Sequence, residues 1–542
     1  MAVGSLDGLT KSYFDLRWHL DPVGASQSGI AAHDGRLGRF GKGTLTPHLA
    51  AMKSLTLALE EVATDGVDEE IDRTALLNDL RVTQNRFEKE RPQTRNPEFW
   101  LSHLLNGLYL LLARRDRPDA HRARALTERL EEVPAFLDDA RATLTDPVRV
   151  YCETGRQMTA GGLALVREAG VTISRLGAQD GLSSERVMGA LDGARAALES
   201  FDKDLDRWTD SGSDEFALGE DAFNFRLHYE HVLRDTAPEL WRYGHRLKEE
   251  IEADLTERAK RLDGKRSWRE VIARLREEHP PAGELVPFYG KAMERARKFV
   301  ETRKIAPLPA GTLEVVMTPE FLRPLVPFAA YEAPGTFSAD RNGWFYVTPP
   351  DSGLPPAQQE RVLRDHGCKW EVSGVTVHEG YPGHHLHIMH AQEQPSPIRK
   401  LILSPLTLEG WALYCEEMMA EEGFYDREEE RFFQRVHLLW RALRVLLDVG
   451  LHTRGMTFEQ AVDQIVATFG VERSNAEAEV RRYCAWPAYQ ICYAVGRREI
   501  LSLRDDFKQA KGRAYSLNAF HEAIFSYGAL PISLIRWGLG LA

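Results

Sequence analysis

The chain has 542 residues, a formal net charge of −12 at pH 7 and an ordinary composition for a globular protein, with 43% hydrophobic and 28% charged residues. This length is too great for one simple hydrophobic core, so we expect two or three subdomains around a cleft. The acidic balance argues against a nucleic-acid partner, which requires concentrated Lys and Arg. Because no run of about 18 apolar residues occurs, we expect no membrane span.

The N-terminus and the cysteines both predict a cytoplasmic protein. Residues 1–7 have neither a basic start nor an apolar stretch, so no secretory signal is expected. The five cysteines are scattered along the chain and form no Cys-x-x-Cys pair, which is typical of reduced thiols in the cytoplasm.

Most of the chain is predicted to be helical, because apolar residues recur at steps of three and four. The amphipathic runs cover residues 122–143, 186–208, 221–262, 286–303, 428–451 and 474–506. Capping boxes, in which a hydroxyl residue precedes Glu or Gln by three positions, predict helix starts after Ser267, Thr457 and Ser474. An interruption of the helical pattern divides the chain into an N-terminal helical wall or lid, residues 1–210, and a catalytic helical domain, residues 211–542.

The region between residues 307 and 350 breaks the helical pattern, since it is rich in Pro, Gly and β-branched or aromatic residues. Its segments 312–317 and 343–348 are predicted as short strands of a small antiparallel sheet near residues 312–348. The edge of such a sheet is suited to bind an extended substrate as an additional strand, and a purely structural hairpin is the alternative. The expected fold is therefore mainly α, a multi-helix cradle around a central cleft with this small sheet.

Residues 376–388 carry the pattern on which the functional prediction depends, because four histidines and a glutamate lie within ten positions. A catalytic zinc site needs three ligands from His and carboxylate side chains, an open position for water and a carboxylate base nearby. His378 is the first candidate ligand and Glu379 is the candidate base. The usual His-Glu-x-x-His motif lies on an unbroken helix, whereas here Pro382 occupies the position of the second histidine and disrupts the helix.

Two histidines are candidates for the second ligand. If the helix bulges by two residues around Pro382, His384 returns to the face of His378. If the helix stays regular, His385 lies on that face but about 10 Å further along the axis, which is too far to share one ion. We therefore favour His384 as the second ligand and keep His385 as the alternative.

The third ligand is expected from a following helix, on which Glu409 is the candidate. Taken alone, Glu409 is better explained as a surface glutamate favoured by the helix dipole, and the histidine cluster favours the ligand role instead. Glu416 or Glu417, one or two turns further on, is expected to orient a ligand histidine. His387 and His390 are expected to face solvent or to support the ligands.

The same residues resemble a known family. The stretch 378–385 matches the His-Glu-x-x-Pro-Gly-His-His signature of domain-of-unknown-function family 885 (DUF885). Further agreement with this family occurs at residues 20–22, 33–37, 409–414, 448–452, 479–483, 493–496 and 520–522. The resemblance thus spans nearly the whole chain. The helical cradle of this family, and the order His, Glu, Glu of its candidate site residues, also look like those of the gluzincin zinc peptidases, such as carboxypeptidase Taq.

This resemblance implies roles for five further residues. His452 is expected to donate to a tetrahedral oxyanion, with an exposed histidine at a helix end as the alternative. Tyr493 is the candidate for a catalytic phenolic hydrogen bond and Tyr489, four residues earlier, for substrate binding, with core packing as the alternative. Arg481 and Arg482 are candidates for binding a substrate carboxylate, unless they pair with neighbouring glutamates.

The expected function is that of a zinc hydrolase with one Zn²⁺ ion, which cleaves an amide bond in a short peptide or peptide-like substrate as a dipeptidase or carboxypeptidase does. His378, His384 and Glu409 are expected to hold the ion, while Glu379 takes a proton from the attacking water and returns it to the leaving amine. One alternative is a metal-dependent tailoring enzyme that acts on a specialised metabolite. Another is a non-catalytic helical scaffold with a vestigial metal site.

Overall fold

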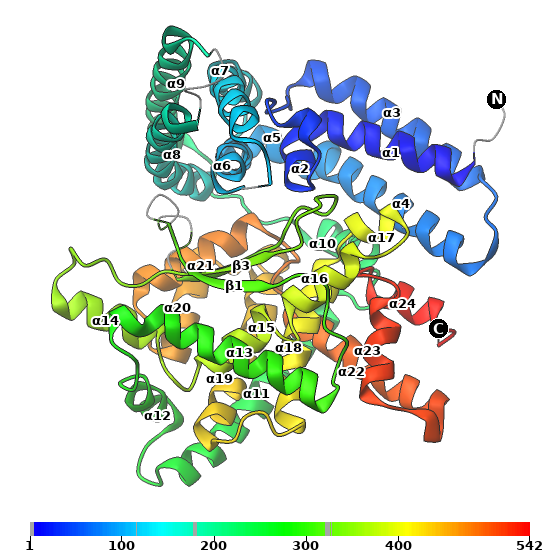
Figure 1. Ribbon diagram of the computed structural model, residues 1–542, viewed down its shortest axis with the longest axis vertical. Coiled ribbons are helices and arrows are strands. Elements are labelled where there is room, and N and C mark those ends of the chain that lie inside the picture. The colour runs from blue at the N-terminus through cyan, green and yellow to red at the C-terminus, as the bar shows by residue number, and fades with distance from the viewer. Residues whose placement is uncertain are drawn as a thin grey trace. The chain divides into compact units, whose positions relative to one another are not determined.

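The computed structural model describes residues 5–114, 116–176, 182–319, 323, 326 and 328–541. The prediction of a mainly α fold with one small sheet is confirmed (Figure 1). The chain forms two compact units, of which the first comprises Met1–Phe216 with Pro334–Asp340 and the second comprises Ala217–Ala333 with Arg341–Ala542. Among the described residues, no helix is both long and apolar enough to cross a membrane.

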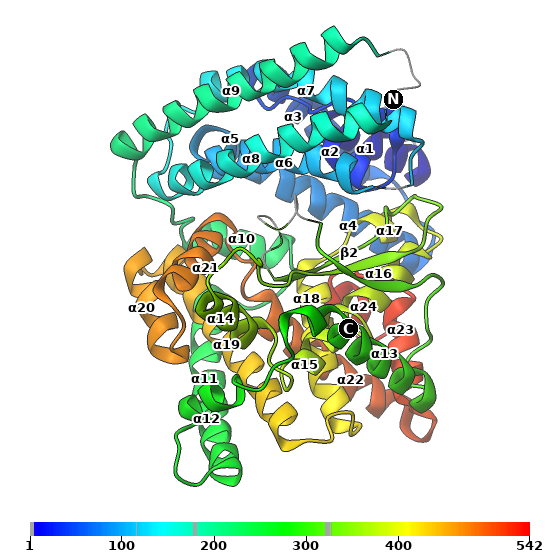
Figure 2. The same ribbon diagram turned by 60° about the vertical axis from the view of Figure 1, so that its left-hand side comes forward.

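The first unit is a set of packed helices, in which α8 and α9 lie side by side (Figure 2). Its α-helices are α1 (Leu6–Leu20), α2 (Pro22–Gln27), α3 (Lys42–Glu61), α4 (Gly66–Asn85), α5 (Pro92–Arg95), α6 (Pro97–Ala113), α7 (Asp119–Thr143), α8 (Arg149–Leu176) and α9 (Ser184–Ser211). The fully buried guanidinium of Arg129 links these elements, since it donates to the carbonyl oxygens of Arg36 and Gly107 and to the hydroxyl of Ser26.

The second unit contains all the candidate site residues. Its α-helices are α10 (Glu220–Tyr229), α11 (Ala237–Leu262), α12 (Trp268–Leu275), α13 (Leu285–Arg303), α14 (Pro356–His366), α15 (Val372–Glu379), α16 (His384–Gln392), α17 (Pro397–Leu401), α18 (Pro405–Glu421), α19 (Glu428–Thr453), α20 (Phe458–Phe469), α21 (Arg473–Ala485), α22 (Cys492–Lys511), α23 (Leu517–Phe525) and α24 (Ile532–Gly538). The capping boxes at Ser267 and Thr457 are confirmed as the starts of α12 and α20. The predicted start after Ser474 is wrong, because α21 begins at Arg473 with Glu472 as its N-cap.

The packing of α18 against α22 brings the candidate site residues of these two helices together. Gly410 of α18 and Gly496 of α22 face each other, and a Cβ atom at either position would collide with the backbone of the other helix. The absence of side chains at both positions therefore allows the two backbones to touch. This contact lies one residue from Glu409 and three residues from Tyr493 in the sequence.

The small sheet has the strand order β1-β3-β2, with β1 (Leu313–Met317), β2 (Ala329–Glu332) and β3 (Gly343–Val347). The expectation of an antiparallel sheet is wrong for its two predicted strands, because β1 pairs in parallel with β3 and only β2 pairs with β3 in the antiparallel sense. The chain turns back through β2 before it forms β3, so β3 runs in the direction of β1. The sequence did not predict β2, whose four residues include no β-branched side chain.

Candidate metal centre

The helix break at Pro382 is an insertion of two residues into the helical path. Helix α15 ends at Glu379 and α16 begins at His384. Across the break, the N–H of Gly383 donates to the carbonyl of Val377 at 3.0 Å and the N–H of Leu386 donates to that of Gly380 at 3.4 Å. Both bonds span six residues, whereas α-helical bonds span four, and the observed form is a gap between two helices rather than the expected bulge.

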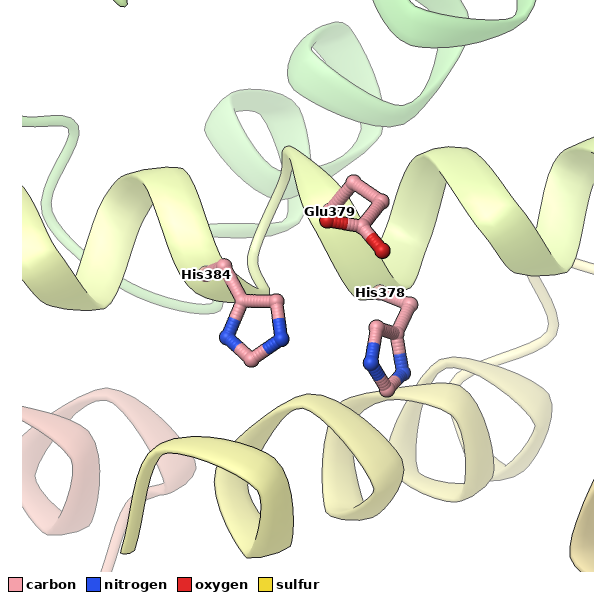
Figure 3. Close-up of side chains that lie close together, drawn as sticks. All are labelled: His378, Glu379 and His384. Carbon is pink, nitrogen blue, oxygen red and sulfur yellow. The ribbon is translucent and has the colours of Figure 1, made fainter. Parts of the chain in front are cut away.

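This insertion puts His384 on the same side of the two helices as His378 (Figure 3). Their ring centres are 4.8 Å apart with the rings almost perpendicular. One donor atom from each of His378, Glu379 and His384 lies within 4.8 Å of the others. The structure thus brings the favoured histidine, His384, into the cluster.

Glycines at both ends of the linker make this path sterically feasible. A Cβ atom on Gly383 would collide with the carbonyl oxygen of His378, and one on Gly380 would collide with the sulfur of Met293. The indole N–H of Trp411, on α18, donates to the carbonyl of Pro382 at 2.8 Å and ties the linker to that helix. The local sequence therefore permits the break, and a tertiary contact holds it.

Glu409 faces both histidines from α18. Its Oε2 lies 3.3 Å from Nε2 of His384 and 3.6 Å from Nε2 of His378. This oxygen is buried and has no hydrogen-bond partner among the described residues, whereas Oε1 accepts a hydrogen bond from the hydroxyl of Tyr489 at 2.6 Å. Burial raises the pKa of Glu409, but the two histidines outweigh it and hold the pKa well below its usual value.

A line of buried side chains orients His378. Its Nδ1 donates to Oε1 of Glu416 at 2.8 Å, and Oε2 of Glu416 accepts from Nδ1 of His437 at 3.2 Å. Nε2 of His437 in turn lies 3.2 Å from Oε1 of Glu371. Because a carboxylate only accepts, the bond to Glu416 places the proton of a neutral His378 on Nδ1 and leaves the lone pair of Nε2 facing Glu409.

The charges around His378 favour a cation at this position. Burial lowers the pKa of His378, but the nearby carboxylates of Glu409 and Glu416 favour the charged imidazole, outweigh burial and raise the pKa to about 9. Two imidazole nitrogens, one carboxylate oxygen and a nearby second carboxylate form the donor set of a catalytic zinc site. Ligand atoms bound at about 2.0–2.1 Å to tetrahedral zinc lie about 3.4 Å apart, close to the separations of Glu409 from the two histidines. The donors therefore fit Zn²⁺.

Glu379 lies on the last turn of α15, and one of its carboxylate oxygens is within 4.8 Å of a nitrogen of each imidazole (Figure 3). It is partly exposed. No side-chain hydrogen bond to another described residue ties it down, so its carboxylate is available to a water molecule at the cluster.

Both tyrosines lie at the cluster, and they contact different parts of it. The ring of Tyr493, on the first turn of α22, stacks on His378 with 6.3 Å between centres and 19° between planes. Tyr489 lies in the turn before α22 and donates to Glu409, so its contact is with a candidate metal ligand instead of the expected substrate. Burial raises the pKa of both phenols, which keeps them protonated near neutral pH.

Asp448 holds the turn that carries Tyr489, a role that the sequence did not predict. Its buried carboxylate accepts from the backbone N–H groups of Ala488, Gln490 and Ile491 at 3.0, 2.8 and 3.2 Å. Burial raises the pKa of Asp448 to about 7, although the three N–H groups act in the opposite direction. The sequence contains one signal for this role, since other polar residues lie four positions before and after Asp448 on the same face of α19.

His452 is engaged by backbone groups, and its expected role as an oxyanion donor finds no support. Its Nε2 donates to the carbonyl of Tyr483 at 3.0 Å, and its Nδ1 accepts from the N–H of Leu218 at 3.3 Å. The side chain is fully buried, which also differs from the alternative of an exposed helix-end histidine. Since both ring nitrogens are occupied, His452 joins α19 to two other segments.

The two arginines expected to bind a substrate carboxylate are both in ion pairs. Arg481 lies 3.9 Å from Glu477, and Arg482 donates to both oxygens of Glu479 at 2.9 and 2.7 Å. This is the alternative that the sequence left open.

The remaining histidines of the motif support the fold. His385 is buried with Nδ1 3.1 Å from the hydroxyl of Tyr331 on β2, and burial lowers its pKa to about 4. His387 and His390 were expected to face solvent or to support the ligands. His387 is fully buried, and the Nε2 atoms of the two residues lie 3.0 and 2.9 Å from the carbonyls of Gly528 and Pro307. Each of these two side chains thus contacts a backbone carbonyl outside the motif.

Comparison with known proteins adds a family and a fold. The family model described as "Bacterial protein of unknown function (DUF885)" matches residues 22–538. Among solved structures, a provisionally assigned lipoprotein of unknown function from Shewanella oneidensis is 24% identical with a TM-score of 0.82, over 99% of this chain and 100% of that one. A provisionally assigned lipoprotein from Colwellia psychrerythraea is 17% identical with a TM-score of 0.83, over 99% of each chain. None of the curated proteins matches this chain.

Proposed function

This chain belongs to the DUF885 family of bacterial proteins, as its sequence motifs predicted, and we propose that it is a zinc-dependent hydrolase of amide bonds in short peptides or peptide-like molecules. The observation that carries the proposal is the buried Oε2 of Glu409, which has no hydrogen-bond partner among the described residues and lies between two imidazole nitrogens. A buried carboxylate oxygen without a partner is unfavourable, and a bound cation would satisfy it.

His378, His384 and Glu409 would hold the ion. Zn²⁺ bound there would polarise a carbonyl group and lower the pKa of a water molecule. Glu416 would keep His378 in the tautomer that presents Nε2, and Tyr489 would hold Glu409 through its other oxygen. Such supporting contacts orient ligands and strengthen metal binding.

Glu379 is the proposed general base. It is next to His378 in the sequence, and its carboxylate is within reach of the same small volume as the two imidazoles. It would accept a proton from the attacking water and deliver that proton to the nitrogen of the leaving amine, so the peptide C–N bond breaks with no net change in proton number.

Tyr493 is the proposed hydrogen-bond donor to the oxyanion of the tetrahedral intermediate. Its ring lies against His378, and its burial favours the protonated phenol that such a donor requires. This assignment replaces His452, whose ring nitrogens bind backbone groups.

The resemblance to gluzincin peptidases supports the same proposal. The order His, Glu, His, Glu along the chain is shared, and the second histidine here comes two residues later. The two-residue insertion between α15 and α16 compensates for this difference, since it returns His384 to the side of His378.

The test combines metal analysis with a substrate screen. The full chain should bind about one equivalent of Zn²⁺ after dialysis against zinc and should then hydrolyse members of a panel of dipeptides and acylated amino acids, with activity lost on chelation and restored by zinc. Less than half an equivalent of bound metal, together with no rise in melting temperature on adding zinc, would contradict the proposal.

A further inference from the structure

Helix α19 carries a stripe of polar side chains that are mostly buried. This polar stripe consists of His437, Arg441, Arg444, Asp448 and His452. The spacing of three or four residues puts all five on one face of the helix. The rest of α19 from Phe432 onward is mostly apolar and buried, so each polar member needs a partner inside the protein.

Four members of the polar stripe have close partners. The imidazole of His437 lies 3.2 Å from a carboxylate oxygen on each side. Arg444 donates to the hydroxyl of Tyr483 at 3.0 Å and to Glu479 at 3.1 Å. Asp448 and His452 are satisfied by backbone groups.

Arg441 is the exception. Its Nη1 lies 3.4 Å from the carbonyl of His437, and its Nη2 lies 4.0 Å from Glu416. Its Nε is buried and has no hydrogen-bond partner among the described residues, although 17% of the side chain is exposed. Glu416 already accepts from two imidazoles, so it leaves most of the hydrogen-bonding capacity of this guanidinium unused.

Arg441, with this unused hydrogen-bonding capacity, lies close to a side chain of the metal centre. Its guanidinium carbon lies 5.7 Å from the ring centre of Tyr493, which stacks on His378. Arg444 lies over the same ring at 4.8 Å. Of the acidic groups here, Glu416 is shared with His378 and His437, and Glu479 pairs with Arg444 and also with Arg482. Arg441 and Arg444 thus both lie near the ring of Tyr493, and of the two only Arg444 donates a hydrogen bond to a carboxylate of a described residue.

We propose that Arg441 binds a carboxylate group of the substrate beside the metal centre. The inference rests on the proposed hydrolase function and names its substrate class: short amides that carry a free carboxylate close to the scissile bond. A guanidinium can bind a carboxylate through two parallel hydrogen bonds, which gives both affinity and orientation. Arg441 takes the role that the sequence suggested for Arg481 and Arg482.

The experiment uses two probes with the same zinc-binding group. Succinic acid monohydroxamate carries a carboxylate, and its primary amide replaces that carboxylate with a neutral group of similar size. Their affinities for the zinc-loaded full chain are measured by isothermal titration calorimetry for the wild type, R441M, R441K and R431M. Arg431 lies on the same helix, is 42% exposed and contacts Glu428 at 3.8 Å, so R431M is a matched control outside the site.

The wild type and R431M should bind the acid at least about 10-fold more tightly than the amide, the gain typical of a hydrogen-bonded charge pair. In R441M this preference should fall below about 3-fold while the affinity for the amide stays the same, and R441K should keep part of the preference. Equal binding of acid and amide by the wild type would overturn the carboxylate subsite and leave the metal centre intact. An unchanged preference in a folded R441M would overturn the assignment to Arg441.

Binding of neither probe by the zinc-loaded wild type would overturn the proposed hydrolase site together with this inference, because a catalytic zinc needs an open position that a hydroxamate can occupy. If R441M fails to fold, as judged by circular dichroism, the wild type and R441K still test the inference. The quantity compared is then the ratio of the affinities of each protein for the acid and for the amide. A ratio in R441K as large as in the wild type would then count against bidentate binding, because a lysine cannot form that fork.

Discussion

Nδ1 of His378 donates a hydrogen bond to Oε1 of Glu416 over 2.8 Å, and both side chains are buried. The bond orients the imidazole so that Nε2 faces Glu409. We expect Glu416→Gln to weaken zinc binding by about 10- to 100-fold, the usual cost of losing such a support. Competition with a chelating dye measures the change.

The neighbouring Glu417→Gln is the matched control for that prediction. Glu417 pairs with Arg497 on α22, away from the candidate ligands. The Glu417→Gln variant should therefore bind zinc as tightly as the wild type. Equal losses in both variants would show that Glu416 has no special relation to the metal.

The two adjacent histidines should respond differently to truncation. His384→Ala should lose bound zinc, because its Nε2 is one of the candidate donors beside Glu409. His385→Ala should keep zinc but lose stability, on the order of 2 kcal/mol, because it leaves a cavity and an unpartnered tyrosine hydroxyl beneath the sheet. Metal content by atomic absorption and thermal unfolding give the two readouts. Zinc loss in His385→Ala with zinc retained in His384→Ala would reverse the ligand assignment.

Glu379→Gln should bind zinc normally and lose turnover. The amide keeps the size of the side chain but cannot accept the proton of the attacking water, so we expect kcat/KM to fall by about 10²- to 10⁴-fold. The comparison needs a substrate found in the screen and the zinc content of the same preparation. A variant with full metal and more than about a third of wild-type activity would exclude Glu379 as the base.

Gly383→Ala should disrupt the link between α15 and α16. The added Cβ collides with the carbonyl oxygen of His378, a backbone atom that cannot move aside without displacing the ligand. We expect a lower melting temperature together with a reduced zinc content. Gly290→Ala in α13, where a Cβ meets nothing within 4 Å, should be neutral or slightly stabilising because alanine favours helices. Normal zinc binding by Gly383→Ala would contradict the claim that a Cβ atom at this position displaces His378.

The buried Asp448 should make stability depend on pH. Burial raises its pKa from 3.8 to about 7 in the folded protein, so between these values the folded state holds a proton that the unfolded state has released. The contribution of Asp448 to stability is therefore fully present below about pH 4 and is lost as the pH rises towards 7, by an amount on the order of 3 kcal/mol.

Asp448→Asn isolates that dependence, because its amide oxygen can still accept N–H bonds but does not titrate. The difference in melting temperature between the wild type and this variant should shift against the wild type from pH 4.5 to pH 7.5. A difference that is constant over this range would show that Asp448 keeps an ordinary pKa.

Local hydrogen bonds explain why much of the secondary structure could be predicted. The capping boxes at Ser267 and Thr457 involve residues three positions apart, so the sequence contains all the information needed. Strand β2 could not be predicted, because its short polar and alanine-rich segment becomes a strand only by pairing with β3. The interruption between α21 and α22 was also missed, and it depends on Asp448 of another helix.

The sequence by itself determined the chemical types at the centre: His378 and Glu379 on one helix, a second histidine beyond a break, and Glu409 on a later helix. These follow from residue type and spacing, which are local properties. Only the tertiary structure decided between His384 and His385, between Glu416 and Glu417, and between free and paired arginines. Each of these choices depends on which faces of distant helices meet, and that is set by long-range packing, such as the glycine contact between α18 and α22.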